Sequence, residues 1–285
     1  MSQPSDLKVS ASLQQLISEM QTLPSLPSLY RELIDIMHSE DVSVDRAARI
    51  IAKDMGMVTK ILQVVNSPFY GLRMKVSSPA QAVALLGLTT IKSLVLSRNV
   101  FAQFDQSKLP FFSLEVLWQH GMTVGVHARD IIRQEGAEQG LVDDAFTAGM
   151  LHDVGTLVLA TNMPDQYTET LAIMRDRGLS EWGAEREVFG ATHAEVGGYL
   201  LGKWNLSPIV VDAVAYHHEP SLCSGSNAAA VAAVHVANTV EEEEQATAMG
   251  ETPPPMDIGY LTGCGLADRL PLWQALCRGE AISRT

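Results

Sequence analysis

The sequence predicts an all-α protein made of an N-terminal helical lobe and a second helical lobe. Apolar residues recur at helical spacing through most of the chain, as in Leu13, Leu16, Ile17 and Met20. Alternation with a period of two, which would indicate strands, is absent. The composition, with 46% hydrophobic and 19% charged residues among 285, is that of a globular chain with a sizeable core.

Prolines and caps define the helices expected in the first lobe. Leu23-Pro24 and Leu26-Pro27 impose an extended break, because each proline disfavours the helical region for the residue before it. Ser43 is placed to cap one helix, and Ser78-Pro79 begins another that closes near Gly87. Helices are therefore expected at 13–20, 30–37, 43–51, 57–65, 79–87 and 90–104.

The second lobe is expected to begin after Lys108-Leu109-Pro110. Ser113 caps a long helix, and Thr192-His193-Ala194-Glu195 has the pattern of a reciprocal capping box. Further helices are expected at 143–152, 164–178, 208–218, 227–240 and 266–277. The glutamate run 241–244 and the proline-rich run 252–255 are interpreted as one acidic, mobile loop.

The formal net charge of −13 limits the classes of partner. An acidic surface repels nucleic acid backbones and anionic membranes, so we expect neither as a partner. The first 15 residues lack the basic start and apolar core of a signal peptide, and apolar runs of membrane-spanning length are absent. Three cysteines without metal-type spacing fit a reducing compartment. We therefore expect a cytoplasmic protein.

Residues that bind metals recur along the second lobe. They are His120, the pair His152-Asp153, His193 and the pair His217-His218, with Asn238 where a further carboxylate would complete the set. Imidazole and carboxylate ligands together suit Fe, Mn, Zn and similar ions that act on phosphate esters. The spacing is too wide for a zinc finger, so several helices must assemble the site. The other three histidines, His38, His127 and His235, are interpreted as surface or packing residues.

The segment Gly149-Met150-Leu151-His152-Asp153-Val154-Gly155 resembles the signature of the HD superfamily of metal-dependent phosphohydrolases. The first lobe adds Leu23-Pro24-Ser25-Leu26-Pro27, Asp54, Val65-Asn66-Ser67-Pro68-Phe69-Tyr70-Gly71 and the run from Ser78 to Gly87. Together these segments resemble the HDOD family of bacterial signalling domains, which is related to the HD-GYP phosphodiesterases. The resemblance implies a domain at 23–219, with lobes at 23–107 and 108–219. Residues 1–22 then form an N-terminal helix and extension, and 220–285 a completing helix, the loop and a last helix.

By position, the resemblance implies that the metal ligands are His120, His152, Asp153, His193, His217 and His218. Three departures reduce the expected chemistry. Asn238 replaces the closing aspartate, and its amide oxygen brings no charge to the metal. Thr156 stands where the enzymes have a lysine, and the element after His218 lacks the GYP motif. Because Asp153 is then the only anionic ligand, we expect no required cofactor and at most one divalent ion, either Fe, Zn, Mn or Ni.

Three functions remain open from the sequence. The resemblance favours a non-catalytic signalling module that recognises a protein partner, with a degenerate metal or nucleotide site. The alternative is a metal-dependent phosphohydrolase or cyclic-dinucleotide phosphodiesterase. A pocket that senses a nucleotide without cleaving it would lie between these two. A nucleic-acid binder is disfavoured by the net charge.

Overall fold

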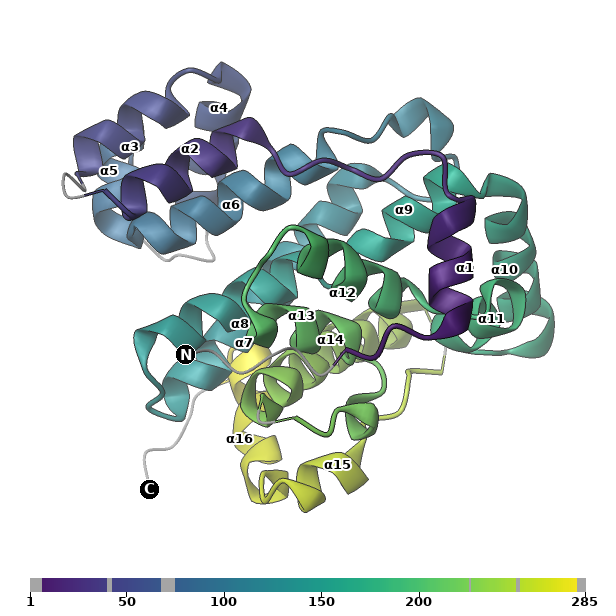
Figure 1. Cartoon of the computed structure of the whole chain (residues 1–285). Coiled ribbons are helices and arrows are strands. Elements are labelled where there is room, and N and C mark those ends of the chain that lie inside the picture. The colour runs from purple at the N-terminus through teal and green to yellow at the C-terminus, as the bar shows by residue number, and fades with distance from the viewer. Residues whose placement is uncertain (1–6, 40–42, 68–74, 226, 250–251, 281–285) are drawn as a thin grey trace. The chain divides into compact units, whose positions relative to one another are not determined.

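A computed structural model describes residues 7–39, 43–67, 75–225, 227–249 and 252–280. Every regular element in these ranges is a helix, so the predicted all-α fold is confirmed (Figure 1). The chain divides into two compact units. One comprises Pro24–Gln103, and the other comprises Met1–Leu23 together with Phe104–Thr285.

The smaller unit is built from five helices in the described residues: α2 (Ser28–Met37), α3 (Val44–Ile51), α4 (Met55–Val65), α5 (Pro79–Leu86) and α6 (Leu88–Phe101). Side chains of Ser43, Asp54 and Ser78 cap α3, α4 and α5 by accepting hydrogen bonds from backbone amides. Apolar residues at helical spacing, such as Leu33 and Ile36, are buried in its core. The distinctive Pro68-Phe69-Tyr70-Gly71 segment lies outside the described residues.

Within the described residues, no one helix combines the length and apolar character needed to cross a membrane. The pair α5 and α6 passes that test only when both helices are counted together, and the pair is bent by 118°.

The larger unit contains the remaining helices. They are α1 (Ala11–Glu19), η2 (Gln106–Lys108), α7 (Leu114–Gln134), α8 (Gln139–Leu151), α9 (Val154–Asn162), α10 (Pro164–Arg177), α11 (Glu181–Phe189), α12 (His193–Lys203), α13 (Pro208–Ala215), η3 (Pro220–Leu222), α14 (Ala228–Met249), α15 (Ile258–Gly263), η4 (Ala267–Arg269) and α16 (Leu270–Cys277). Helix α7 packs against α8 and α14, and α12 packs against α9 and α13. These two groups meet through α8, α13 and α14 and form the core of the unit.

Helices α7 and α8 approach closely because glycines face each other. A Cβ atom on Gly149 would lie 2.5 Å from the Cα atom of Gly125. A side chain at either position would push the helices apart. The close approach brings the C-terminal end of α8 beside the N-terminal half of α7, where His120 lies.

The structure corrects two expectations. The glutamates at 241–244 belong to α14, which continues to Met249 and buries Ala246. Glutamate is a good helix former, so a charged run of this kind extends a helix whose apolar face is already packed. Helix α8 begins at Gln139 rather than at Asp143, because residues 139–142 include the buried Val142 and continue the helical pattern. Residues 252–255 are not helical, as expected.

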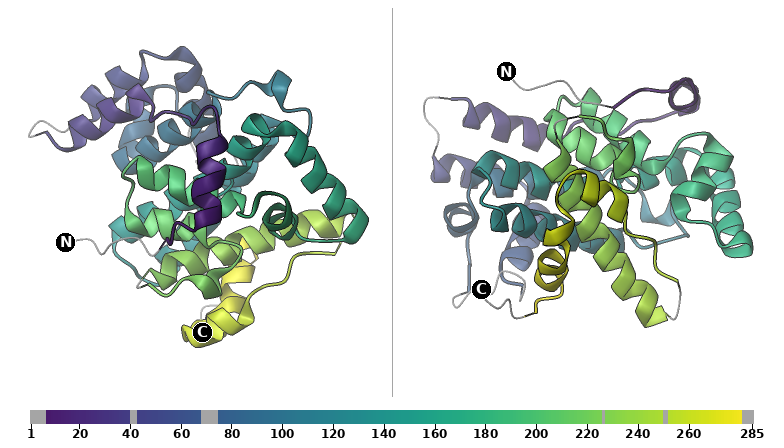
Figure 2. Two further views of the ribbon diagram at one scale, coloured as in Figure 1. Left: turned by 45° about the vertical axis from the view of Figure 1, so that its right-hand side comes forward. Right: turned by 90° about the horizontal axis from the view of Figure 1, so that it is seen from below.

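The C-terminal segment folds back onto the larger unit. Helix α16 packs against α7 and α14 (Figure 2). The Glu135 carboxylate at the end of α7 accepts hydrogen bonds from the Trp273 indole at 2.8 Å and the Arg269 guanidinium at 2.9 Å. These contacts fix the segment beside the helices that carry the candidate site.

Candidate metal centre

The larger unit brings together all six predicted ligands and Asn238. His120 lies in α7, and His152 and Asp153 occupy the junction between α8 and α9. His193 is the first residue of α12, His217 and His218 follow α13, and Asn238 is buried in α14. His193 lies in the first turn as predicted, since Thr192 and Glu195 form the reciprocal capping box.

The motif from Gly149 to Gly155 predicts that a helix ends and the chain turns at Gly155, but the break between α8 and α9 lies at His152-Asp153 and Gly155 is inside α9. Gly155 is needed for a different reason. A Cβ atom there would lie 1.9 Å from the carbonyl oxygen of His193. The glycine therefore lets the start of α12 approach the start of α9, which places His193 beside Asp153.

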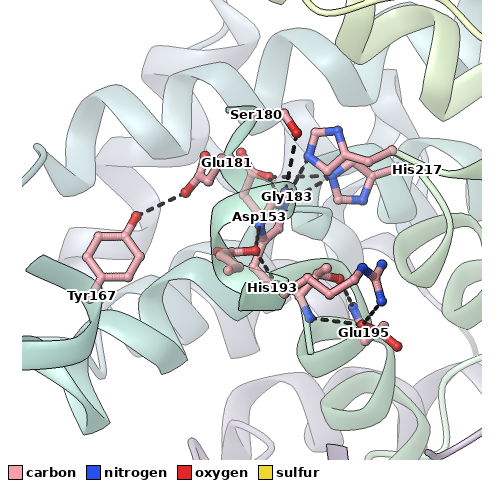
Figure 3. Close-up of polar contacts among 12 residues, drawn as sticks. Asp153, Tyr167, Ser180, Glu181, Gly183, His193, Glu195 and His217 are labelled. Atoms are coloured by element: carbon pink, nitrogen blue, oxygen red, sulfur yellow. Dashed lines mark hydrogen bonds and ion pairs between the residues drawn. The ribbon is translucent and has the colours of Figure 1, made fainter. Parts of the chain in front are cut away.

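The two carboxylate oxygens of Asp153 face two different sets of histidines. Its Oδ1 lies 3.5 Å from His193 Nε2 and 3.8 Å from His217 Nε2, and Figure 3 shows Asp153 near both rings. Its Oδ2 lies 3.1 Å from His152 Nε2 and 3.6 Å from His120 Nε2. Asp153 thus divides the centre into a His193 half and a His120 half.

Hydrogen bonds to Nδ1 orient three of the rings with Nε2 toward the centre. The Nδ1–H groups of His152 and His217 donate to the carbonyl oxygens of Gly149 and Val214, each at 2.7 Å. The Nδ1–H of His193 donates to Glu185 Oε2, also at 2.7 Å. Metal-bound histidines characteristically donate the second ring N–H in this way, which fixes the tautomer.

The ligand spacing fits tetrahedral coordination. Atoms bound 2.0–2.2 Å from a tetrahedral zinc lie about 3.4 Å apart. In the His193 half, Nε2 of His193 lies 3.4 Å from Nε2 of His217 and 3.1 Å from Nε2 of His218. With Asp153 these atoms form a set of four whose members all lie within 4.8 Å of one another. Three imidazoles and one carboxylate suit Zn, Fe and Ni.

The electrostatics leave His217, His218 and Asp153 in the form that binds a metal, whereas His193 must first release a proton. Burial, followed by the charge of neighbouring histidines, holds the pKa values of His217 and His218 well below the usual value, so both rings are neutral. Burial opposes the ionisation of Asp153, but the charge of His152 outweighs it and holds the pKa of this carboxyl well below its usual value. Metals bind neutral imidazole and ionised carboxylate, so these residues need not release protons first.

The sequence profile of the HDOD domain matches residues 23–220 of this chain. The chain belongs to the HDOD family. The predicted resemblance is therefore confirmed, and the match covers the predicted ligands from His120 to His218 and stops before Asn238.

Known proteins are similar to this HDOD chain in sequence or in fold. A protein of unknown function from Treponema pallidum (strain Nichols) is 26% identical over 214 residues, which are 74% of this chain but only 40% of that protein. The chain therefore spans less than half the length of this curated relative.

Three crystal structures share the fold. An HDOD domain protein of unknown function from Geobacter sulfurreducens has a TM-score of 0.73 at 23% identity, over 93% of this chain and 91% of that one. A proposed phosphohydrolase from Shewanella amazonensis SB2B has a TM-score of 0.69 at 24% identity, over 95% and 97%. A proposed signal transduction protein from Marinobacter aquaeolei VT8 has a TM-score of 0.71 at 17% identity, over 96% and 66%.

A cleft of about 410 Å³ opens onto the His120 half of the centre in this HDOD chain. Its polar lining includes four carboxylates, those of Asp153, Glu181, Glu241 and Glu242, together with His120. Phe112, Val116 and Leu117 supply an apolar wall, and among the described residues that line the cleft none is lysine or arginine. Thr156, at the position of the expected lysine, is buried in α9.

The acidic residues around the centre were not predicted from the sequence. Glu185 is fully buried, and its carboxylate also accepts a hydrogen bond from the backbone N–H of His193 at 2.8 Å. Burial alone would lower the pKa of His193, but the charge of Glu185 outweighs it and raises that pKa to about 10. Glu181, which accepts from the Tyr167 hydroxyl at 3.0 Å, has a pKa raised to about 7 by burial (Figure 3). No motif marks these glutamates, but the spacing of 181 and 185 places both on one face of a helix.

Two of the remaining histidines, His38 and His235, lie as interpreted from the sequence. His38 is exposed. His235 is buried in α14 and joins the centre to the C-terminal segment, since its Nδ1–H donates to the His217 carbonyl at 2.7 Å and its Nε2 accepts from the Asp257 amide at 3.0 Å. Trp182, a residue that no sequence motif marks, stacks on His218 with 4.1 Å between ring centroids.

Proposed function

We propose that this HDOD chain is a non-catalytic signal-transduction module that binds a protein partner and holds one divalent ion, Fe, Zn, Mn or Ni, in the His193 half of its centre. The ion stabilises the packing of α9, α12 and α13 rather than activating water on a phosphate ester. The acidic lining of the cleft over the centre is the observation that carries this proposal.

Hydrolysis of a phosphate ester needs positive charge where the phosphate sits. A single divalent ion brings two positive charges, fewer than the negative charges of the four cleft carboxylates when they are ionised. Even two ions would only balance those carboxylates. Burial raises the pKa of Glu242 to about 7, so binding of a cation in the cleft would favour its ionised form. The cleft therefore attracts metal ions and repels phosphate, which also argues against a nucleotide ligand.

The apolar wall of the cleft supports a protein partner. Phe112, Val116 and Leu117 line the opening, and the Val116 side chain is 65% exposed. An apolar residue beside acidic ones offers a contact for a basic or amphipathic segment of another protein.

The alternative function is a metal-dependent phosphohydrolase. One observation favours it, which is the complete four-residue geometry of the His193 half.

A hydrolysis assay tests the non-catalytic part of the proposal. The full chain, its metal content measured, is incubated with Mn²⁺ or Fe²⁺ and with a cyclic dinucleotide or a nitrophenyl phosphate ester. We expect bound metal but no turnover above that of the Asp153→Ala variant. Metal-dependent turnover that Asp153→Ala abolishes would establish the phosphohydrolase instead.

Cross-linking of the chain in extracts tests the protein partner, with the Val116→Glu variant as comparison. Equal recovery of cross-linked partner by both chains would argue against the apolar wall as the binding surface.

A further inference from the structure

His235 is a buried histidine whose two ring nitrogens join two separate parts of the backbone. It lies in α14, and its side chain is 2% exposed. Its Nδ1–H donates to the His217 carbonyl oxygen at 2.7 Å, and its Nε2 accepts from the Asp257 backbone N–H at 3.0 Å. A carbonyl oxygen only accepts and an amide N–H only donates, so the two partners fix one neutral tautomer of the ring. The ring therefore bridges His217, a predicted ligand, and Asp257.

The bond to the His217 carbonyl helps to orient two neighbouring predicted ligands. His217 and His218 lie between α13 and η3, so the peptide group that joins them is outside both helices. A peptide group is planar, so a hydrogen bond to the His217 carbonyl restrains the plane that contains the Cα atoms of both residues. Their Nε2 atoms lie 3.4 Å and 3.1 Å from His193 Nε2. The spacing of the His193 half therefore depends in part on how His235 holds this peptide.

Asp257 belongs to a segment that contacts the larger unit at several points. Its carboxylate caps α15 by accepting from the Tyr260 amide at 2.8 Å, and it also accepts from the Ser221 hydroxyl at 2.5 Å. Farther along the chain, α16 packs against α7 and α14. This C-terminal segment, residues 252–280, lies beyond residue 220, where the match to the HDOD profile ends. The family motif therefore gives no account of how the segment contacts the ligands.

We propose that His235 is a positioning residue that couples the C-terminal segment to the metal centre. The inference rests on the proposed function, because it requires an ion in the His193 half. The Asp257 amide holds the His235 ring, and the ring holds the peptide between His217 and His218 in the orientation that the ion needs. Coupling between two binding events is reciprocal, so an ion in the centre stabilises the docking of the segment to the same extent. Displacement of the segment would then weaken ion binding.

Hydrogen exchange of the full chain with and without saturating Zn²⁺ tests the coupling. The backbone amides of α15 and α16 should exchange more slowly when the ion is bound, by about fivefold or more, although these helices contain none of the predicted ligands. Unchanged exchange in these helices, with Zn²⁺ bound as measured by calorimetry, would overturn the proposal and leave the metal centre of the proposed function intact.

Two substitutions of His235 separate its two hydrogen bonds. The amide of asparagine reaches about as far as Nδ1, so His235→Asn keeps a donor for the His217 carbonyl and loses the acceptor for Asp257. The amide of glutamine reaches about as far as Nε2, so His235→Gln keeps the acceptor and loses the donor.

The two variants should differ in calorimetry with Zn²⁺. His235→Gln should bind the ion about 10- to 100-fold more weakly, as is typical when an outer-shell partner of a ligand is lost. His235→Asn should lose only about fivefold, and the ion should no longer slow exchange in α15 and α16. Because coupling is reciprocal, that loss should match the factor by which Zn²⁺ slows exchange in the unmodified chain.

Tyr260→Phe is the matched control. It removes the hydrogen bond from the Tyr260 hydroxyl to the Ala228 carbonyl at 3.2 Å, which joins α15 to α14 without touching His235 or His217. The variant should speed exchange in α15 equally with and without Zn²⁺ and should keep the ion affinity of the unmodified chain.

The outcomes are distinct. Slower exchange that His235→Asn abolishes, together with the larger loss of affinity in His235→Gln, supports the proposal. Equal losses of affinity in the two variants would contradict the positioning role, because loss of the ring's packing alone would explain them. An unmodified chain that binds no Zn²⁺ would overturn the metal centre and this inference with it. Circular dichroism checks that each variant folds, and exchange in the unmodified chain tests the coupling even where a variant does not.

Discussion

Gly155 and His193 approach each other so closely that a Cβ atom on the glycine would lie 1.9 Å from the histidine's carbonyl oxygen. This approach joins α9 to α12 and places two predicted ligands together, with Asp153 Oδ1 3.5 Å from His193 Nε2. The geometry of the centre therefore depends on a residue that has no side chain. A substitution at Gly155 can therefore test the packing of α9 on α12 in the absence of metal.

We expect Gly155→Ala to destabilise the protein and weaken metal binding. The added methyl group meets backbone rather than a flexible side chain, so the helices must move apart, at a cost of about 3 kcal/mol or more. Gly140→Ala, in α8, is the control, since a Cβ atom there meets nothing within 4 Å. Thermal unfolding by circular dichroism measures both. The packing argument is wrong if the two variants melt at the same temperature.

Divalent ions should stabilise the chain. A ligand that binds only the folded state at about 100 times its Kd adds about 2.7 kcal/mol, which raises the Tm by about 5 °C or more. A chelator should reverse the increase. His217→Ala removes a buried ligand and should abolish the response, whereas His38→Ala, at an exposed position, should retain it. A rise in Tm that persists in His217→Ala would place the ion elsewhere.

Glu185→Gln should weaken metal binding in the His193 half by about 10- to 100-fold, because the buried carboxylate orients the His193 ring and increases its basicity. Glu187 lies on the same helix but is exposed and ion-paired to Arg177, so the Glu187→Gln variant should bind metal as tightly as the unmodified chain. Calorimetry measures both variants. Equal affinity in Glu185→Gln would show that Glu185 has only a structural role.

Asp257 should contribute stability that depends on pH. Burial opposes its ionisation, but hydrogen bonds from the Ser221 hydroxyl and the Tyr260 amide outweigh burial and hold the pKa of this carboxyl below its usual value. A lowered pKa in the folded state gives stability that is present above the unfolded pKa, about 3.9, and is lost as the pH falls through the folded value.

The expected consequence is that Asp257→Asn is less stable than the unmodified chain at pH 7, by about 0.5 kcal/mol, and that the difference disappears toward pH 3. Urea unfolding at several pH values measures it. Asp268→Asn, at an exposed position, should show no such trend. A difference that stays constant from pH 7 to pH 3 would contradict the assignment.

The sequence by itself determined the helical fold, the family and the order of the ligands. Helical periodicity, proline breaks and caps such as Ser43, Ser78 and Thr192 are local signals. In the structure each of these three side chains accepts a hydrogen bond from a backbone amide in the first turn of its helix. The HD pair and the histidines could be identified because the motif fixes their residue types and order.

Only the tertiary structure decided how these residues act together. The division of the centre by Asp153, the orientation of His193 by Glu185 and the acidic cleft all depend on side chains far apart in the sequence. The part of Glu241 and Glu242 in the cleft lining could not be recognised while residues 241–244 were interpreted as a loop, because it requires that α14 continues through them. Helix propensity is a weak local preference, and burial of Val240 and Ala246 is the tertiary contact that favours continuation of the helix.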